Sequence, residues 1–257
     1  MTNYQLINSR IRRKASLFLL ASCLYQIGWT TYAMIYTFTF RLPGDGKMLG
    51  AATFRYFTND SNILNALSCL LMLPSLIRCL KKPGPVFREA LLLLRYIAVS
   101  ALTLTFLTVV FFLCPIYGYQ NMFSGVDLYL HLAGPLLSMV SFLFPERLIL
   151  SSSVQPPRRQ NPPAKKEVQT TKQHDGKREY RLPWLAVLFS MIPMLIYAVF
   201  YIRNVVILGP EKGGWPDFYA LNTNGSWPYS LAIMTGAVFA IGFILRLFYN
   251  HQFRRTL

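Results

Sequence analysis

The polar run "TNDSN", Thr58 to Asn62, opens a segment of the chain that then becomes strongly apolar. On a helix, residues at positions i, i+3, i+4 and i+7 share one face. One polar face of this kind is formed by Arg55, Thr58, Ser61, Asn62 and Asn65. Unsatisfied polar groups are costly against lipid, so we expect this face to point into the protein or a water-filled cavity. Asp60 falls outside that face, and we expect it nearer the membrane interface.

A second group of reactive side chains lies in "GVDLYLHLAGPLL", which begins at Gly125. Asp127 and His131 are four residues apart, so a helix places them one turn from each other. A carboxylate in this position can accept a hydrogen bond from one imidazole nitrogen and leave the other free as a base. Thr58 and His131 are expected about 6 and 8 Å deep along helices that run in the same direction. We therefore expect the two side chains to be able to meet.

A threonine hydroxyl becomes an effective nucleophile when an adjacent base removes its proton. The pattern thus predicts Thr58 as nucleophile, His131 as general base and Asp127 as the group that orients the imidazole. Candidate donors of hydrogen bonds to a developing oxyanion are Asn59, Ser61 and Asn62. Such a site near the outer leaflet suits hydrolysis of an ester embedded in lipid.

Two other functions are consistent with the same polar residues. Serine, threonine, asparagine and histidine often hold membrane helices together by hydrogen bonds, which describes a non-catalytic scaffold. Ionisable residues within a membrane also line transport or ion pathways, which describes a transporter or channel. The sequence contains no clear inverted repeat of the kind that many transporters use.

The elements that must position these residues are membrane helices. Of the 257 residues, 53% are hydrophobic and only 14% are charged, a composition typical of a multi-pass membrane protein. About twenty apolar residues suffice to cross the hydrocarbon core. Six such segments are expected at Ser16 to Phe40, Phe54 to Leu76, Ala90 to Leu113, Val126 to Leu148, Leu182 to Leu208 and Tyr229 to Tyr249. The predicted fold class is all-α, a six-transmembrane-helix bundle.

The net charge of +16 follows from the topology of such a bundle. Lys and Arg gather in the connections on the cytoplasmic side of membrane proteins. Here 20 of the 26 lie on one side of the expected helices and four on the other. This distribution predicts both termini in the cytoplasm, and it explains the charge without a nucleic-acid partner. The expected partners are membrane lipid and a lipid-like ester.

The chain is expected to divide into three parts. Residues 1–150 contain the first four transmembrane helices, residues 151–181 form a basic, disordered cytoplasmic linker, and residues 182–257 contain the last two helices of the same bundle. Prolines at positions 74, 135 and 193 are expected to bend their helices.

Two further expectations concern isolated side chains. Arg95 lies near the inner end of its helix, so we expect it to extend to the cytoplasmic headgroups rather than take part in a site. The four cysteines are expected to be small buried hydrophobic residues. No metal-ligand cluster, phosphate-binding glycine loop or other cofactor motif is visible in the sequence.

Three motifs carry a resemblance to a known family. "YFTNDSN" at the start of the second segment, "DLYLHLAGPLL" in the fourth and "WPY" before the sixth resemble bacterial six-transmembrane proteins related to the androgen-induced and androgen-dependent membrane hydrolases of animals. The resemblance implies a threonine and a histidine as the catalytic pair, acting on fatty acid esters of hydroxy fatty acids. By motif position these residues fall on Thr58 and His131.

Overall fold

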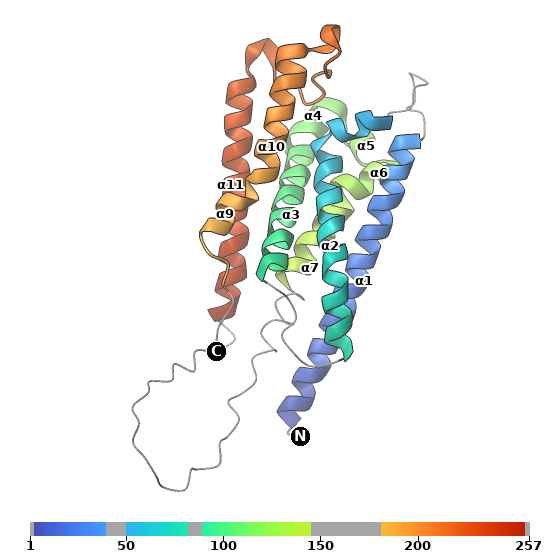
Figure 1. Cartoon of the computed structure of the whole chain (residues 1–257), viewed down its shortest axis with the longest axis vertical. Coiled ribbons are helices and arrows are strands. Elements are labelled where there is room, and N and C mark those ends of the chain that lie inside the picture. Colours follow the sequence, from blue (N-terminus) through green and yellow to red (C-terminus); the bar gives the residue numbers. More distant parts are fainter. Residues whose placement is uncertain (1–2, 40–49, 82–88, 145–180, 255–257) are drawn as a thin grey trace.

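A computed structural model describes residues 3–39, 50–81, 89–144 and 181–254 (Figure 1). Within these ranges the secondary structure is helical and contains no β-strand. Six helices of this part of the chain are long and apolar enough to cross a membrane. They cover Arg13–Thr39, Phe57–Lys81, Glu89–Tyr117, Gly125–Leu143, Leu185–Leu208 and Trp227–His251. The predicted all-α, six-transmembrane bundle is therefore confirmed.

Three of the six spans are continuous α-helices and three are broken into shorter pieces. The continuous ones are α1 (Asn3–Thr39), α2 (Phe57–Lys81) and α11 (Trp227–Arg254). The third span consists of α3 (Glu89–Thr108), η2 (Val109–Leu113) and α4 (Cys114–Tyr117). The fourth consists of α6 (Gly125–Leu128), η3 (Tyr129–Ala133) and α7 (Gly134–Leu143). The fifth consists of α9 (Leu185–Ser190), α10 (Ile192–Tyr201) and η4 (Ile202–Leu208).

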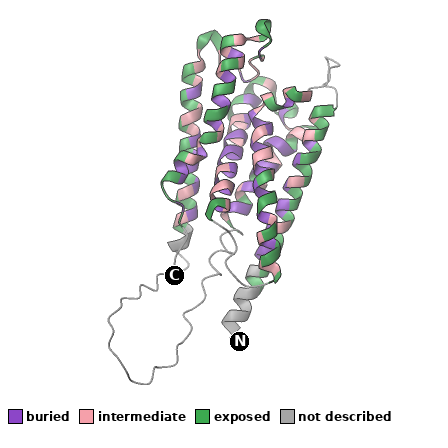
Figure 2. Cartoon of the chain, viewed as in Figure 1, coloured by how far each residue is buried: buried purple, intermediate pink, exposed green. Residues whose placement is uncertain are grey.

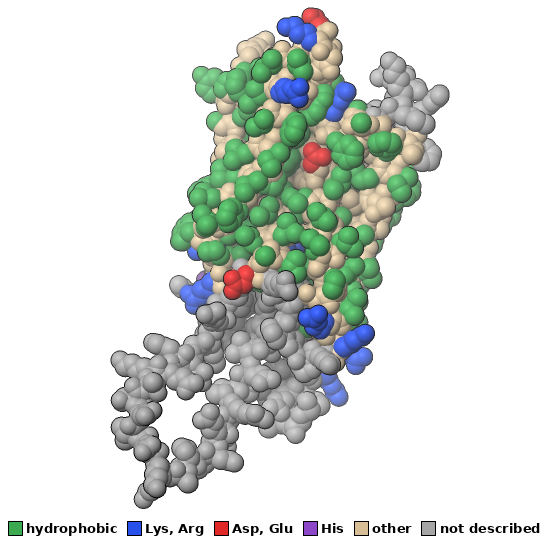
Figure 3. Space-filling model, in the orientation of Figure 1, with side chains coloured by type: hydrophobic (Ala, Val, Ile, Leu, Met, Phe, Trp, Pro, Cys, Tyr) green, Lys and Arg blue, Asp and Glu red, His purple; other side chains and the backbone are tan. Residues whose placement is uncertain are grey.

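Helix α3 lies at the centre of the bundle. It packs against α2 and α7 on one side and against α9 and α11 on the other, while α1 packs against α2 (Figure 1). More than half of its residues are buried. Buried residues follow the interior of the bundle and exposed ones its outer faces (Figure 2). Hydrophobic side chains cover the surface between two ends that carry basic residues, which is the surface expected of a membrane protein (Figure 3).

Two of the three prolines expected to bend helices lie at breaks. Pro135 follows η3, a π-helical turn, and Pro193 follows the break between α9 and α10 at Met191. Proline has no N–H and its ring crowds the preceding turn, so a regular α-helix cannot continue through it unchanged. Pro74, in contrast, lies inside the continuous helix α2.

Short elements cap the end of the bundle at which α2 begins. They are η1 (Gly50–Arg55), α5 (Tyr119–Met122), η5 (Pro210–Lys212) and η6 (Thr223–Gly225). Within this cap, the Asp217 carboxylate accepts hydrogen bonds from the Tyr201 hydroxyl at 2.7 Å and from the amides of Leu221 and Asn222 at 3.1 and 2.8 Å. These bonds fix the loop between the fifth and sixth spans against the bundle.

Some expectations fall on residues outside the described ranges. They include all but the last residue of the linker expected at 151–181 and the end of the fourth segment near Leu148.

The cysteines agree with the prediction in part, since Cys23, Cys69 and Cys114 are buried and Cys79 is half-buried.

Candidate active site

The polar face of α2 points into the bundle, as expected. Thr58, Ser61, Asn62 and Asn65 are each at most 7% exposed, whereas Leu67 on the same helix is 46% exposed. Arg55 does not belong to this helical face, because it ends η1 and α2 begins two residues later. Asn59 is also buried, and its side-chain amide donates to the Thr53 carbonyl at 2.8 Å.

His131 lies in the middle of the π-helical turn η3. The Gly134 N–H donates to the Tyr129 carbonyl, five residues back, instead of to the Leu130 carbonyl. The next residue along the chain is Pro135, which cannot donate to the Leu130 carbonyl because proline has no N–H. The side-chain amide of Asn62 supplies the missing bond, donating to the Leu130 carbonyl at 3.1 Å and to the Thr58 carbonyl at 2.8 Å. The irregular turn that carries His131 is thus fixed to α2 beside Thr58.

The imidazole of His131 is held in one tautomer by the main chain. Its Nδ1 lies 2.7 Å from the Met122 carbonyl oxygen, which can only accept, so Nδ1 carries the proton. The other nitrogen, Nε2, then has a free lone pair, and no described residue donates a hydrogen bond to it. The sequence predicts Asp127 as the orienting group. In the structure Asp127 lies within electrostatic range of His131, but Nδ1–H donates its hydrogen bond to the Met122 carbonyl instead.

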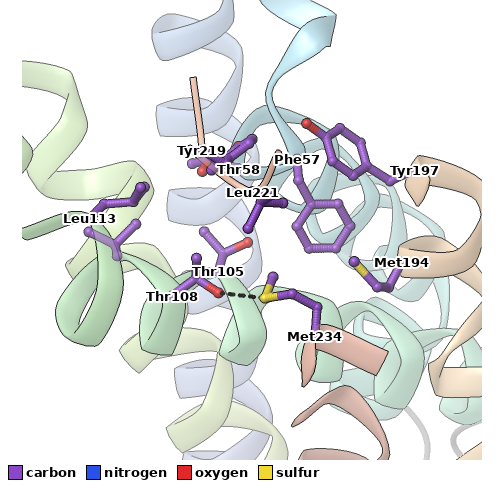
Figure 4. A pocket seen from close by; sticks show the side chains of 11 residues that line it. Phe57, Thr58, Thr105, Thr108, Leu113, Met194, Tyr197, Tyr219, Leu221 and Met234 are labelled. Atoms are coloured by element: carbon purple, nitrogen blue, oxygen red, sulfur yellow. Dashed lines mark hydrogen bonds between the residues drawn. The ribbon is translucent and has the colours of Figure 1, made fainter. Parts of the chain in front are cut away.

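Thr58 lines a narrow cavity between α2, α3, α10, α11 and the outer loop, which we term the inner cavity (Figure 4). Its walls are formed by Phe57, Thr58, Thr105, Thr108, Val109, Leu113, Met194, Tyr197, Tyr219, Leu221 and Met234. The volume is about 20 Å³, enough for a single water molecule. A ligand larger than water therefore enters only if side chains of the wall move.

Thr58 and His131 lie on contacting elements, since α2 packs against η3. No hydrogen bond joins the Thr58 hydroxyl to the imidazole, and His131 does not line the inner cavity. Asn62 bonds to the Thr58 carbonyl and to the residue before His131, so one side chain links the two positions. Its Oδ1 is buried without a hydrogen-bond partner among the described residues.

The three side chains predicted as oxyanion donors are already engaged. The amides of Asn59 and Asn62 donate to main-chain carbonyls, as described above. The Ser61 hydroxyl is shared between the Thr58 carbonyl at 2.9 Å and the Thr105 hydroxyl at 2.8 Å. These bonds stabilise the start of α2 and leave its side-chain donors little freedom to bind a substrate.

Tyr219 is a donor that the sequence reasoning missed. It comes from the outer loop and lines the inner cavity together with Thr58 (Figure 4). Its buried hydroxyl makes no hydrogen bond to a described residue, although the Thr58 hydroxyl and the amides of Phe57 and Thr58 are close. Burial raises the pKa of the Tyr219 phenol to about 12, so the group is a neutral O–H donor at physiological pH. The only sequence signal was an aromatic loop with turn residues.

A larger opening, which we term the lateral groove, lies between α2 and α10 on the outside of the bundle. It has a volume of about 470 Å³, within the usual range for sites that bind small molecules. Its lining residues are Phe54, Phe57, Asp60, Ser61, Leu64, Pro193, Ile196, Tyr197, Phe200 and Trp215. Phe57 and Tyr197 line both openings and lie with ring centroids 5.3 Å apart, so this aromatic pair separates the groove from the inner cavity.

The expectation for Arg95 is wrong. Its side chain is 0% exposed, and it donates to the side chains of Asn65 on α2 and Ser141 on α7, the latter at 2.8 Å. Asn65 also accepts from Ser138 and donates to Gln26 on α1. The guanidinium therefore joins a buried polar network across four spans instead of extending to the headgroups, because these partners satisfy it inside the bundle.

The described residues contain no group of three or more His, Cys, Asp or Glu side chains placed to hold a metal ion. Comparison with protein-family models, with curated proteins and with solved structures gave no match for this chain. The fold therefore defines the class of the protein, a six-helix integral membrane protein.

Proposed function

We propose that this protein is a threonine hydrolase that cleaves lipid esters within the membrane, with Thr58 as nucleophile and His131 as general base. The observation that carries the proposal is the state of His131. Its Nδ1–H donates to the Met122 carbonyl, which leaves Nε2 as a base with no hydrogen-bond partner among the described residues, on a turn that Asn62 links to the main chain of Thr58. The resemblance of the "YFTNDSN" and "DLYLHLAGPLL" segments to the animal membrane hydrolases points to the same two residues. In a bacterium, such a protein belongs in the cell membrane.

The proposed reaction has two steps. The Thr58 hydroxyl oxygen attacks the ester carbonyl carbon, its proton passes to His131 Nε2, and the alcohol leaves with that proton as the acyl group stays on Thr58. Water then attacks the carbonyl carbon of the acyl-threonine and loses a proton to Nε2. The bond to the Thr58 oxygen breaks, Nε2 returns that proton to this oxygen, and the fatty acid leaves. Because no hydrogen bond joins Thr58 to His131 in this state, the first transfer needs a bridging water or a shift on substrate binding.

Tyr219 supports this reaction as the oxyanion donor. Its neutral hydroxyl faces the cavity beside Thr58 and is free of other hydrogen bonds to described residues. A donor already placed where negative charge develops lowers the barrier without reorganisation. Asp127, in electrostatic range of His131, stabilises the imidazolium that forms.

The proposal is tested by ester hydrolysis with purified protein in lipid nanodiscs. Thr58→Ala and His131→Asn should lower the rate by about 100-fold or more, the usual effect of losing a nucleophile or base. Tyr219→Phe should lower kcat by about 100-fold. Thr58→Ser, which keeps a hydroxyl, is the matched control and should retain activity. Equal rates for Thr58→Ala and Thr58→Ser would refute the nucleophile.

A scaffold is the competing function, and one observation favours it. Asn62 and Ser61 satisfy carbonyls and hydroxyls between helices, as polar residues do in bundles without chemistry. A scaffold predicts that Thr58→Ala changes thermal stability in detergent while the wild-type protein shows no hydrolysis above the rate of the empty nanodisc.

A further inference from the structure

Among the described residues that line the lateral groove, Asp60 is the one acidic residue. Every other lining residue except Ser61 is apolar or aromatic. The groove follows α2 inward from Phe54 and Trp215 to Leu64 and Pro193, so it has an outer end with the carboxyl group and a deeper apolar end. This is the shape and polarity of a site for an amphiphile.

The Asp60 carboxyl group has no hydrogen-bond or ion-pair partner among the described residues. Its main-chain N–H donates to the Tyr56 carbonyl. The titratable groups that sense its charge are the phenols of Tyr197 and Tyr219, and the Tyr197 hydroxyl is already bonded to the Arg55 carbonyl. A carboxyl group in the wall of an apolar groove at membrane level therefore has no partner of opposite charge among the described residues.

Unpaired charges are costly at membrane depth and are normally matched by a partner of opposite sign. An apolar groove alone accepts any acyl chain, but the carboxylate favours a head group that carries positive charge and N–H donors. An ammonium group meets both requirements. Anionic lipids are disfavoured there by like-charge repulsion.

We propose that the lateral groove binds a membrane amphiphile with a protonated amine head group. The ammonium pairs with Asp60 and the alkyl chain lies along α2 and α10 toward Leu64 and Pro193. The site is distinct from Thr58, and the proposal stands or falls independently of ester hydrolysis.

Trp215 in the groove wall provides the measurement. The full-length protein in uncharged alkyl maltoside micelles is titrated with a medium-chain alkylamine brominated in the half of its chain nearer the head group, because Trp215 lies at the outer end of the groove. The matching brominated alcohol and carboxylic acid are titrated in the same way. Bromine quenches the fluorescence of nearby tryptophans. The part of the quenching that is lost in Trp215→Phe measures binding of the brominated compound in the groove. A short, water-soluble alkylamine tests whether the ammonium group binds without a chain.

The amine should bind about tenfold more tightly than the alcohol, the gain expected from one charge-assisted hydrogen bond. Asp60→Asn should remove that preference and Asp60→Glu should keep it, while the short amine should not compete. Equal affinity for amine and alcohol in the wild-type protein, or a preference unchanged in Asp60→Asn, would overturn the proposal. The comparison of amine, alcohol and carboxylic acid in the wild-type protein tests the proposal even if a variant fails to fold.

Discussion

At the scale of single residues, the position and tautomer of His131 depend on an irregular main chain. The π-helical turn and Pro135 leave the Leu130 carbonyl without a main-chain donor, and Asn62 supplies it. Turns of this kind often occur at functional sites, because they re-aim one side chain within an otherwise regular helix. The same turn brings Nδ1 of His131 to the Met122 carbonyl and so sets the tautomer.

Replacing Asn62 should therefore destabilise the protein. In Asn62→Leu the Leu130 carbonyl is buried without a donor, which costs about 1–3 kcal/mol. We expect a clear fall in the unfolding temperature in detergent, measured by intrinsic fluorescence. Leu67→Ala on the exposed face of α2 is the control, because it removes no hydrogen bond. A melting temperature for Asn62→Leu at or above that of the control would contradict this role.

At the scale of elements, the sixth span approaches the third and fifth closely at Gly242. The Tyr96 hydroxyl donates to the Gly242 carbonyl at 2.6 Å. A Cβ atom at position 242 would collide with the Ser190 hydroxyl and lie 3.0 Å from the Tyr96 hydroxyl. Small residues allow this kind of close helix packing in membranes.

Gly242→Ala should thus lower stability, by about 1–3 kcal/mol for an overpacked contact. Gly236→Ala in the same helix is a matched control, since nothing lies within 4 Å of its added methyl group. Alanine forms helices more readily than glycine, so the control should melt at the same temperature as the wild type or higher. Equal losses in both variants would show that α11 is not held at Gly242.

A second prediction at this scale concerns the Phe57 and Tyr197 pair. If these rings close the inner cavity toward the lipid, Phe57→Ala should open it. The test uses Thr105→Cys, placed in the cavity wall, in a chain whose native cysteines are replaced by alanine. Labelling by a membrane-soluble maleimide should rise at least about tenfold in Phe57→Ala. It should not rise in Phe200→Ala, whose ring lines only the groove. No difference between the two would exclude a gate at this position.

At the scale of the whole molecule, the bundle carries a hydrophobic surface between two basic ends (Figure 3). Helix α1 begins and α11 ends at the same end of the bundle (Figure 1). The distribution of Lys and Arg predicts that this end faces the cytoplasm. A fluorescent protein fused to the C-terminus in bacteria should therefore fluoresce, and alkaline phosphatase at the same position should stay inactive. The reverse pattern would show that the topology is inverted and that Thr58 lies in the cytoplasmic leaflet.

The sequence predicted the helices and the buried face of α2 because both follow from local rules. Apolar length defines a span, and Thr58, Ser61 and Asn62 cannot face lipid at helical spacing. Arg95 was misjudged because its partners, Asn65 and Ser141, come from other helices whose packing no local pattern reveals. Met122 was missed for a related reason, since a main-chain carbonyl has no signature in the sequence.

The outer loop shows the same limit on prediction from sequence. The loop is rich in turn residues and aromatic side chains, and the Asp217 hydrogen bonds hold it as a structured cap. That Tyr219 reaches into the bundle beside Thr58 depends on how this cap docks. The candidate oxyanion donor could therefore be recognised only from the structure.

Labelling by a fluorophosphonate probe tests the proposed nucleophile most directly. The probe is applied to purified protein in nanodiscs, and the modified residue is identified by mass spectrometry. We predict one adduct on Thr58 in the wild-type protein, no adduct in Thr58→Ala and labelling at least about 100-fold slower in His131→Asn. Labelling that is unchanged in both variants, or an adduct on another residue, would contradict the assignment of Thr58 and His131 as a catalytic pair.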